Sequence, residues 1–229
     1  MRKLTVFFMF FILAVTLGSQ TASAGACGTA TLADYTVSGF TCTIGDKTFS
    51  NFSYVATKTG GATLISAGGV TVVPENVGGE IGFMFSSGWA AGSGSSQGAS
   101  IDYTVTAGPG FKIVDAVLDI AGVATPGTGS VGVGEALSNG NTLSVSAGGS
   151  LTSSASFTGT SSVTVDTTVN VSGGRAGVGA VSSVSNLFSQ AQGSTPPVPE
   201  PGSMLLLGSG LVFLGGKLRR RRSGKSVTA

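Results

Sequence analysis

The central part of this chain alternates apolar and polar side chains with a period of two residues. Ile101, Tyr103 and Val105 form one apolar row, and the valines at 163, 165, 169 and 171 form another. Such alternation is typical of antiparallel strands with one face buried and the other in water. No stretch of the middle shows a persuasive helical period. The pattern therefore predicts an all-β fold, a β-sandwich or jelly-roll, over residues 25–193.

Turn signals divide this region into short strands. Gly45-Asp46 and Asn139-Gly140 each lie between apolar runs, where hairpin turns are expected. Phe49, Phe52 and Tyr54 share a face only if a bulge near Ser50 and Asn51 restores the parity. Residues 88–96 are predicted to be a long loop, and residues 146–193 are either part of the domain or a Ser/Thr/Gly-rich stalk. The predicted strands cover 35–44, 47–57, 62–73, 79–86, 100–107, 111–122, 129–137, 142–147, 150–158, 161–172 and 177–188.

The first residues have the three parts of a secretory signal. Arg2 and Lys3 precede an apolar run over residues 4–17, and Ala22-Ser23-Ala24 supplies small residues before a cleavage point. We predict a signal peptide over residues 1–24, with cleavage between Ala24 and Gly25. The alternative is a retained anchor, but the apolar run is short for a span of about 20 residues.

The chain has two cysteines, Cys27 and Cys42. In an exported chain they can pair in only one way, and the oxidising compartment favours a disulfide between them. The alternative is lipidation of Cys27, because the three residues before it look like a lipoprotein cleavage box. That box lacks the usual leucine three residues before the cysteine.

The C-terminal end contains a second topogenic segment. A Pro-rich linker over 194–202 includes Pro199, Glu200 and Pro201, and an apolar stretch over 203–218 follows it. The stretch is short for a bilayer, but basic side chains beyond it can snorkel, so we predict one transmembrane helix. Residues 219–229 form a basic tail that is expected to stay in the cytoplasm. Its orienting residues are Arg219, Arg220, Arg221 and Arg222.

This ending resembles the PEP-CTERM sorting signal, which combines a Pro-Glu-Pro motif, an apolar segment and a terminal arginine cluster. The resemblance implies recognition by an exosortase, a membrane enzyme thought to cleave near the motif in Gram-negative bacteria that make extracellular polysaccharide. Residues 27–54 also look like the opening of many PEP-CTERM proteins of uncharacterised function. Both resemblances imply a cellular destination for the protein, and neither implies a chemical activity.

The charges are concentrated at the two ends of the chain. Residues 25–198 contain four basic and nine acidic residues, which gives a net charge of −5, although the net charge of the whole chain is +2. A nucleic-acid surface needs clustered Lys or Arg on the folded part, so no nucleic-acid partner is predicted.

Few residues could carry catalysis. The chain has no histidine, which removes Ser-His-Asp and Cys-His arrangements and the commonest zinc sites. Asp115 and Asp119 would share a strand face about 13 Å apart, too far for a glycosidase pair by spacing alone. No D-x-D-x-D-G calcium loop is present, and the Gly-rich stretches at 129–134 and 173–177 lack a phosphate-loop context. We therefore predict no enzyme activity, no cofactor and no metal site.

Two functions remain after these exclusions. The first is a non-catalytic cell-surface or extracellular-matrix protein of the exopolysaccharide layer, or biofilm. The second is a carbohydrate-binding module, with Trp89 as the candidate sugar contact. The predicted partners are an exosortase, the membrane and extracellular polysaccharide. The protein is expected at the inner membrane before processing, and at the cell surface or outside the cell afterwards.

Overall fold

The computed structural model describes residues 24–193. Nearly all of the predicted signal peptide lies outside the described residues, as do the linker at 194–202, the predicted transmembrane helix at 203–218 and the basic tail at 219–229. Within residues 24–193, no helix is both long enough and apolar enough to cross a membrane. The rest of this section concerns the domain that these residues form.

The domain contains two seven-stranded sheets, which we call sheet A and sheet B. Sheet A has the order β1 (Gly25–Ala26), β3 (Thr41–Ile44), β4 (Lys47–Thr59), β7 (Ser96–Ala107), β12 (Ser162–Ser172), β9 (Ser130–Leu137) and β10 (Thr142–Ser146). Sheet B has the order β11 (Thr152–Thr160), β8 (Phe111–Ala121), β13 (Gly179–Phe188), β6 (Glu80–Ala91), β5 (Thr71–Val77) and β2 (Ala30–Thr31), with β14 (Gln190–Gln192) paired to β8. Every pairing is antiparallel except that of β1 with β3.

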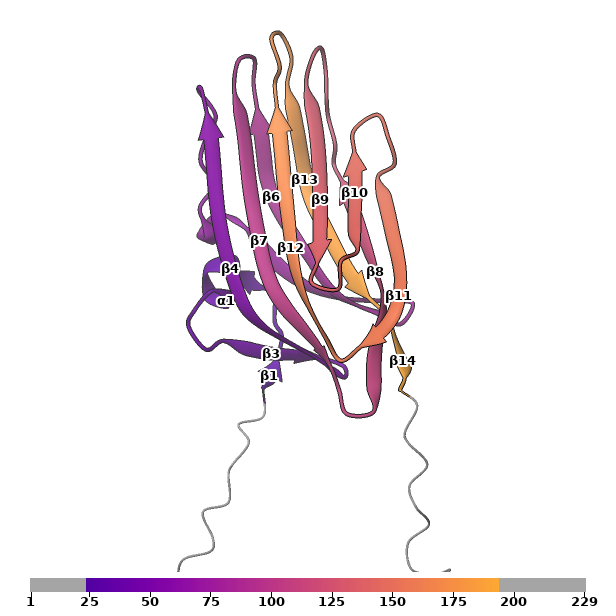
Figure 1. Cartoon of the computed structure of the whole chain (residues 1–229). Helices are drawn as coiled ribbons and strands as arrows, with labels where there is room; N and C mark the ends of the chain where they lie inside the picture. The colour runs from indigo at the N-terminus through magenta and orange to yellow at the C-terminus, as the bar shows by residue number, and fades with distance from the viewer. Residues whose placement is uncertain (1–23, 194–229) are drawn as a thin grey trace, which may run out of the picture. The chain divides into compact units, whose positions relative to one another are not determined.

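The two sheets lie in two layers (Figure 1), and their inner faces share one core. The period-two rows decide which side chains enter it. On β7 the buried positions are every second residue from Gln97 to Val105, and β12 repeats the pattern from Val163 to Val171. Tyr103 stacks on Phe52 in this core, with ring centroids 5.3 Å apart. The predicted all-β class is confirmed, and the two open layers have the arrangement of a β-sandwich.

Residues 146–193, for which the sequence left a domain segment and a stalk as alternatives, are an integral part of the domain. β12 pairs with β7 on one side and β9 on the other, so it lies inside sheet A. β13 pairs with β6 and β8 and lies inside sheet B. Small Ser, Thr and Gly side chains suit these strands, because each strand buries one face only and its backbone is paired on both edges.

Three predicted boundaries are wrong. Residues 35–44 form a strand only from Thr41, and residues 62–73 only from Thr71, after a 3-10 turn at Ala67–Gly69. The predicted loop at 88–96 is mostly strand, because β6 continues to Ala91 and β7 begins at Ser96. Residues 92–95 form the turn that joins these two strands, so the loop is shorter than expected.

The short helix α1 (Leu32–Tyr35) was not predicted. The Thr31 backbone N–H donates to the Asp34 carboxylate at 3.0 Å, and the Thr31 hydroxyl donates to the same carboxylate at 2.6 Å. Thr-x-x-Asp at 31–34 is a capping signal that could have revealed it. A single turn is too short to show a helical period.

The predicted bulge and the first hairpin are confirmed. The pairing of β4 with β7 shifts between Ser50 and Ser53. Asn51 has a φ of 57°, the left-handed conformation that a bulged residue adopts. Gly45, with a φ of 59°, turns β3 into β4 where Gly45-Asp46 was expected. The turn at Asn139-Gly140 also joins two paired strands, β9 and β10.

The disulfide between Cys27 and Cys42 is formed, and it ties the N-terminal segment to β3. The Cys27 N–H also donates to the Thr43 carbonyl at 2.9 Å. Cys27 therefore has no free thiol in the described part of the chain.

We expect loss of this disulfide to destabilise the domain. Its closed loop, with a sequence separation of 15, should contribute about 3 kcal/mol in the chain-entropy model. Urea denaturation of wild type and Cys27→Ser/Cys42→Ser measures this difference. The double variant should not respond to reductant, whereas wild type should lose the same stability on reduction. Equal unfolding of oxidised and reduced wild type would contradict the prediction.

Candidate functional site

The outward face of sheet A carries an array of small polar side chains. We call it the hydroxyl face and define it by the outward residues of β4, β7, β12 and β9. Strand register aligns these residues in rows across the sheet. One row joins Thr57, Gly98, Asn170 and Gly132, and the next row towards the strand ends joins residues 59, 96, 172 and 130. These rows present hydroxyl and amide groups to solvent at regular strand spacing.

These two rows surround a shallow hollow of about 450 Å³. The hollow exists because two positions in the first of these rows, Gly98 and Gly132, have no side chain. A Cβ on Gly132 would have no neighbour within 4 Å, so the hollow is open above this residue. A Cβ on Gly98 would lie 2.7 Å from the Thr57 hydroxyl, so Gly98 permits the close approach of its neighbour. Thr57 and Asn170 supply polar groups at the edges of the hollow.

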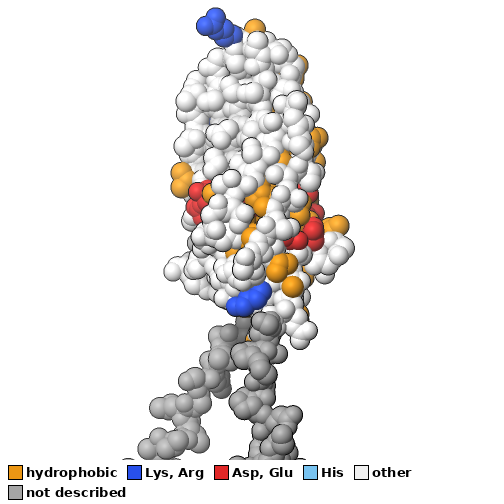
Figure 2. All heavy atoms as spheres, turned by 45° about the vertical axis from the view of Figure 1, so that its right-hand side comes forward, with side chains coloured by type: hydrophobic (Ala, Val, Ile, Leu, Met, Phe, Trp, Pro, Cys, Tyr) orange, Lys and Arg blue, Asp and Glu red, His pale blue; other side chains and the backbone are white. Residues whose placement is uncertain are grey.

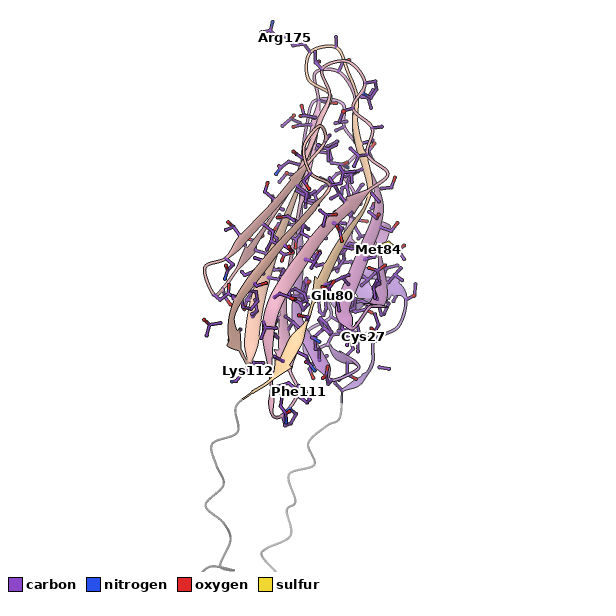
Figure 3. The ribbon with its side chains drawn as sticks, turned by 90° about the vertical axis from the view of Figure 1, so that its right-hand side faces the viewer. Cys27, Glu80, Met84, Phe111, Lys112 and Arg175 are labelled. Carbon is purple, nitrogen blue, oxygen red and sulfur yellow. A yellow bond between two sulfur atoms is a disulfide. The ribbon has the colours of Figure 1, made fainter. Side chains whose placement is uncertain are left out.

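The hollow lies near one end of the domain. Its residues lie in the last part of β4 and β12 and in the first part of β7 and β9. Arg175, in the connection between β12 and β13, lies at this end, whereas Phe111 and Lys112 lie at the other (Figure 3). β1 and β14, where the described part begins and ends, are also at the end opposite Arg175 (Figure 1). The hollow is therefore at the end of the domain opposite β14, the last described strand (Figure 1).

The acidic groups of the hydroxyl face lie outside the hollow. Asp102 and Asp166 are directly opposite each other on β7 and β12. The Ser53 hydroxyl donates to Asp102 at 2.7 Å, and the Ser100 hydroxyl donates to Asp166 at 3.2 Å. Among residues 24–193, no three His, Cys, Asp or Glu side chains come together as a metal site. Figure 2 shows that neutral groups cover most of the visible surface, with charges in small groups.

Trp89 is not part of this surface, and its expected sugar contact is corrected by the structure. Its side chain is 0% exposed and lies in the core, because it follows Phe83 and Phe85 in the inward row of β6. A buried indole has no ring face open to a ligand. Because β6 continues through Gly88, strand parity places Trp89 on the same inner face as Phe83 and Phe85.

Asp115 and Asp119 share the outer face of sheet B, as the strand spacing predicted. They are half-buried, and Asp115 accepts a hydrogen bond from the Ser189 backbone N–H at 2.8 Å. Burial raises the pKa of Glu80, and the charges of Asp115 and Asp119 raise it further.

The core contains a polar cluster that the sequence analysis missed. Glu135 and Thr167 are opposite each other on the inner face of sheet A, and Asn186 enters between the layers from sheet B. The Asn186 amide donates to the Thr167 hydroxyl oxygen at 2.8 Å and to a Glu135 carboxylate oxygen. Burial raises the pKa of Glu135 to about 8, and the hydrogen bond from Asn186 partly opposes this shift. Burial also raises the pKa of the neighbouring Tyr103.

The raised pKa of Glu135 predicts a pH-dependent stability. Below the ordinary value of 4.5, Glu135 is protonated in both the folded and the unfolded chain. As the pH rises towards 8, the unfolded chain releases this proton while the folded chain retains it, so the free energy of unfolding falls. The loss attributable to Glu135 should be on the order of a few kcal/mol and should stop above the folded pKa.

Urea denaturation of wild type and Glu135→Gln at pH 5 and pH 8 measures this loss. The neutral glutamine cannot titrate, so the stability difference between variant and wild type isolates Glu135 from the other groups. We expect that difference to shift in favour of the variant at pH 8. A difference that is independent of pH would show that Glu135 titrates normally.

Comparisons with known proteins identify the C-terminal part of the chain. Residues 197–222 match the family model of the PEP-CTERM protein-sorting motif. The motif implies a secreted protein with a C-terminal membrane-anchoring sorting signal. The chain carries the motif of PEP-CTERM proteins, as the order of proline motif, apolar segment and arginines predicted, and this motif implies exosortase processing.

Comparisons of the domain are less informative. No curated protein matches the chain. The structure of TmCBM61 in complex with β-1,4-galactotriose is similar at 16% identity over 61% of this chain and 88% of that chain, with a TM-score of 0.28. The enzymatically active domain of bacteriophage CBA120 tailspike protein 4 is similar at 13% identity over 60% of this chain and 19% of that chain, with a TM-score of 0.26. At such TM-scores neither likeness bears on the function of this domain.

Proposed function

We propose that this protein is an exported, non-catalytic component of the cell surface or extracellular matrix that binds polysaccharide through the hollow of the hydroxyl face. The observation that carries the proposal is the hollow itself. It lies at the end of the domain opposite β14, the last described strand (Figure 1), and neutral hydrogen-bonding groups line it.

Those groups suit a neutral, hydroxylated ligand. The Asn170 amide can donate and accept, and the hydroxyls of Thr57, Ser130 and Ser172 can do both. A sugar ring could approach the backbone at Gly132, because no side chain projects from it. The lining residues include no aromatic side chain, so binding would rest on hydrogen bonds and shape. Individual contacts would therefore be weak, and many copies on one polysaccharide would add avidity.

The residues around the hollow also support a role without turnover. The lining contains no carboxylate, and the chain contains no histidine to act as a base. Asp102 and Asp166 are engaged by serine hydroxyls on an open face outside the hollow. We propose that an exosortase sorts the protein through its tail and that the domain then remains at the surface or in the matrix, for example in a biofilm.

Two substitutions in the hollow should weaken polysaccharide binding. Asn170→Ala removes a hydrogen-bonding amide and should weaken binding about 3- to 10-fold, as expected for one hydrogen bond. Gly132→Leu should have a larger effect, because its side chain would project into the hollow from a Cβ that has no neighbour within 4 Å. Affinity electrophoresis in exopolysaccharide isolated from the producing bacterium measures both changes.

Thr164→Ala is the matched control, because Thr164 is exposed on the same strand and face but lies outside the hollow. It should bind like wild type. Unchanged binding in both hollow variants, or no binding by wild type, would contradict the assignment of the hollow.

A further inference from the structure

The polar cluster in the core brings a hydroxyl, a carboxamide and a carboxyl group into contact. Thr167, Asn186 and Glu135 are 0%, 0% and 2% exposed. The Asn186 side-chain nitrogen is 2.8 Å from the Thr167 hydroxyl oxygen and also contacts a Glu135 carboxylate oxygen. Thr167 and Glu135 belong to sheet A, and Asn186 belongs to sheet B. The contact therefore crosses the space between the two layers.

This arrangement is costly if the three groups serve only as packing. The second Glu135 oxygen and the Asn186 side-chain oxygen are buried and have no hydrogen-bond partner among the described residues. Each buried polar atom without a partner costs about 1–3 kcal/mol. The surrounding positions in the three rows are apolar, so an apolar triad could fill the same space. Such unpaired groups in a core call for an explanation other than stability.

We propose that Thr167 and Asn186 become joined by an intramolecular ester bond, with Glu135 transferring the protons. The Thr167 hydroxyl oxygen attacks the side-chain carbonyl carbon of Asn186. A bond forms between these two atoms, and the bond from that carbon to the amide nitrogen breaks. One oxygen of the Glu135 carboxyl accepts the hydroxyl proton, and its other oxygen donates a proton to the departing nitrogen. Ammonia leaves, Glu135 returns to its starting state, and no oxidant or co-reactant is consumed.

The core supplies the conditions that this reaction needs. The reacting groups are held in contact, which replaces a bimolecular encounter by an intramolecular one. The surrounding apolar residues exclude water, which would otherwise hydrolyse the ester. Burial raises the pKa of Glu135 to about 8, so that near neutral pH its carboxyl group carries a proton to donate and has an oxygen free to accept one. The reaction occurs once per molecule and is a self-modification, so it is compatible with a non-catalytic role.

The ester would connect β12 to β13 and hence sheet A to sheet B. A covalent link between the layers would resist their separation when the domain is pulled by an attached polysaccharide. The inference does not depend on polysaccharide binding, because it follows from the core geometry alone.

A tryptic map of the full-length exported protein tests the proposal. Trypsin cleaves after Lys112 and Arg175, so Thr167 lies in the peptide 113–175 and Asn186 in the peptide that begins at Ala176. After denaturation and digestion, we expect these two peptides to remain joined, with a mass lower than their sum by one ammonia. Fragmentation should place the link at Thr167 and Asn186, and alkaline hydroxylamine should separate the peptides. The disulfide cannot produce this species, because both cysteines lie before the first of these cleavage sites, within residues 4–47.

Two variants and one internal control complete the test. Thr167→Val keeps the shape of the side chain but lacks the nucleophile, and Glu135→Gln lacks the proton-transferring carboxyl group. Both should yield two separate peptides. Ammonia loss by cyclisation at Asn139-Gly140 would not join the peptides, so only the joined species counts. The proposal is overturned if folded wild type yields separate peptides with intact Thr167 and Asn186, or if Thr167→Val still yields the joined species. The wild-type result decides even if a variant fails to fold.

Discussion

Replacement of Pro199, Glu200 and Pro201 by alanine is expected to leave the exported protein with its full C-terminal end and bound to the membrane. These residues lie in the segment that matches the PEP-CTERM sorting motif. Prolines favour an extended chain whose backbone groups are unpaired, which is the form a protease can thread. We expect the following apolar segment to keep the motif close to a membrane enzyme and the four arginines to resist translocation. Loss of recognition should therefore change the outcome almost completely, from processed to unprocessed protein.

Peptide mapping of membrane and extracellular fractions measures this change. The uncut variant should yield a tryptic species that extends to Lys217, whether or not it is joined to the peptide 113–175, and the mature wild type should lack this C-terminal end. Alanine substitution of Ser194, Thr195 and Pro196 is the matched control, because these residues precede the matched segment. If mature wild-type protein retains the peptide to Lys217, the tail is a permanent anchor and cleavage does not occur.

Trp89→Ala is expected to destabilise the domain by about 3–5 kcal/mol, the usual cost of removing a large aromatic side chain from a core. The indole is 0% exposed and belongs to the core shared by the two sheets, so alanine would leave a cavity there. Trp89→Phe should cost less, because it retains most of the apolar volume. Urea denaturation measures both changes.

Val55→Ala provides the comparison for this prediction. Val55 is 58% exposed on β4, so its truncation should change stability by no more than about 0.5 kcal/mol. Polysaccharide binding by folded Trp89→Phe should equal that of wild type. If that variant kept its stability but lost polysaccharide binding, Trp89 would be a ligand contact and this prediction would be contradicted.

Features that depend on a few neighbouring residues were readable in the sequence. Alternation on β7 and β12 predicted which side chains are buried, because strand geometry sends successive side chains to opposite faces. Gly45-Asp46 predicted a hairpin, and the broken parity of Phe49 and Phe52 predicted the bulge. The cysteine pairing followed from the compartment and from there being one possible pair. The sorting motif was also legible, because an enzyme reads it as a linear segment.

The loop predicted at 88–96 is confined to residues 92–95, because composition is a weaker guide than pairing. Gly, Ser and Ala are common in loops, but here β6 and β7 are stabilised by β13 on one sheet and by β4 and β12 on the other. The same error left Trp89 at the surface. Local preference was overridden by hydrogen bonds to strands distant in sequence, which no local pattern reports.

The sequence by itself indicated the sorting signal of this protein, its all-β class and, for most strands, which side chains face the core. It also contained an overlooked signal: Glu135, Thr167 and Asn186 each interrupt an otherwise apolar row, between Val133 and Leu137, Val165 and Val169, and Val184 and Phe188 respectively. Only the tertiary structure showed that these three interruptions meet, and that Gly98 and Gly132 lie in one row beside Asn170. The physical reason is that side-chain parity is set within a strand, whereas the neighbours of a strand depend on sheet order and on the packing of one layer against the other.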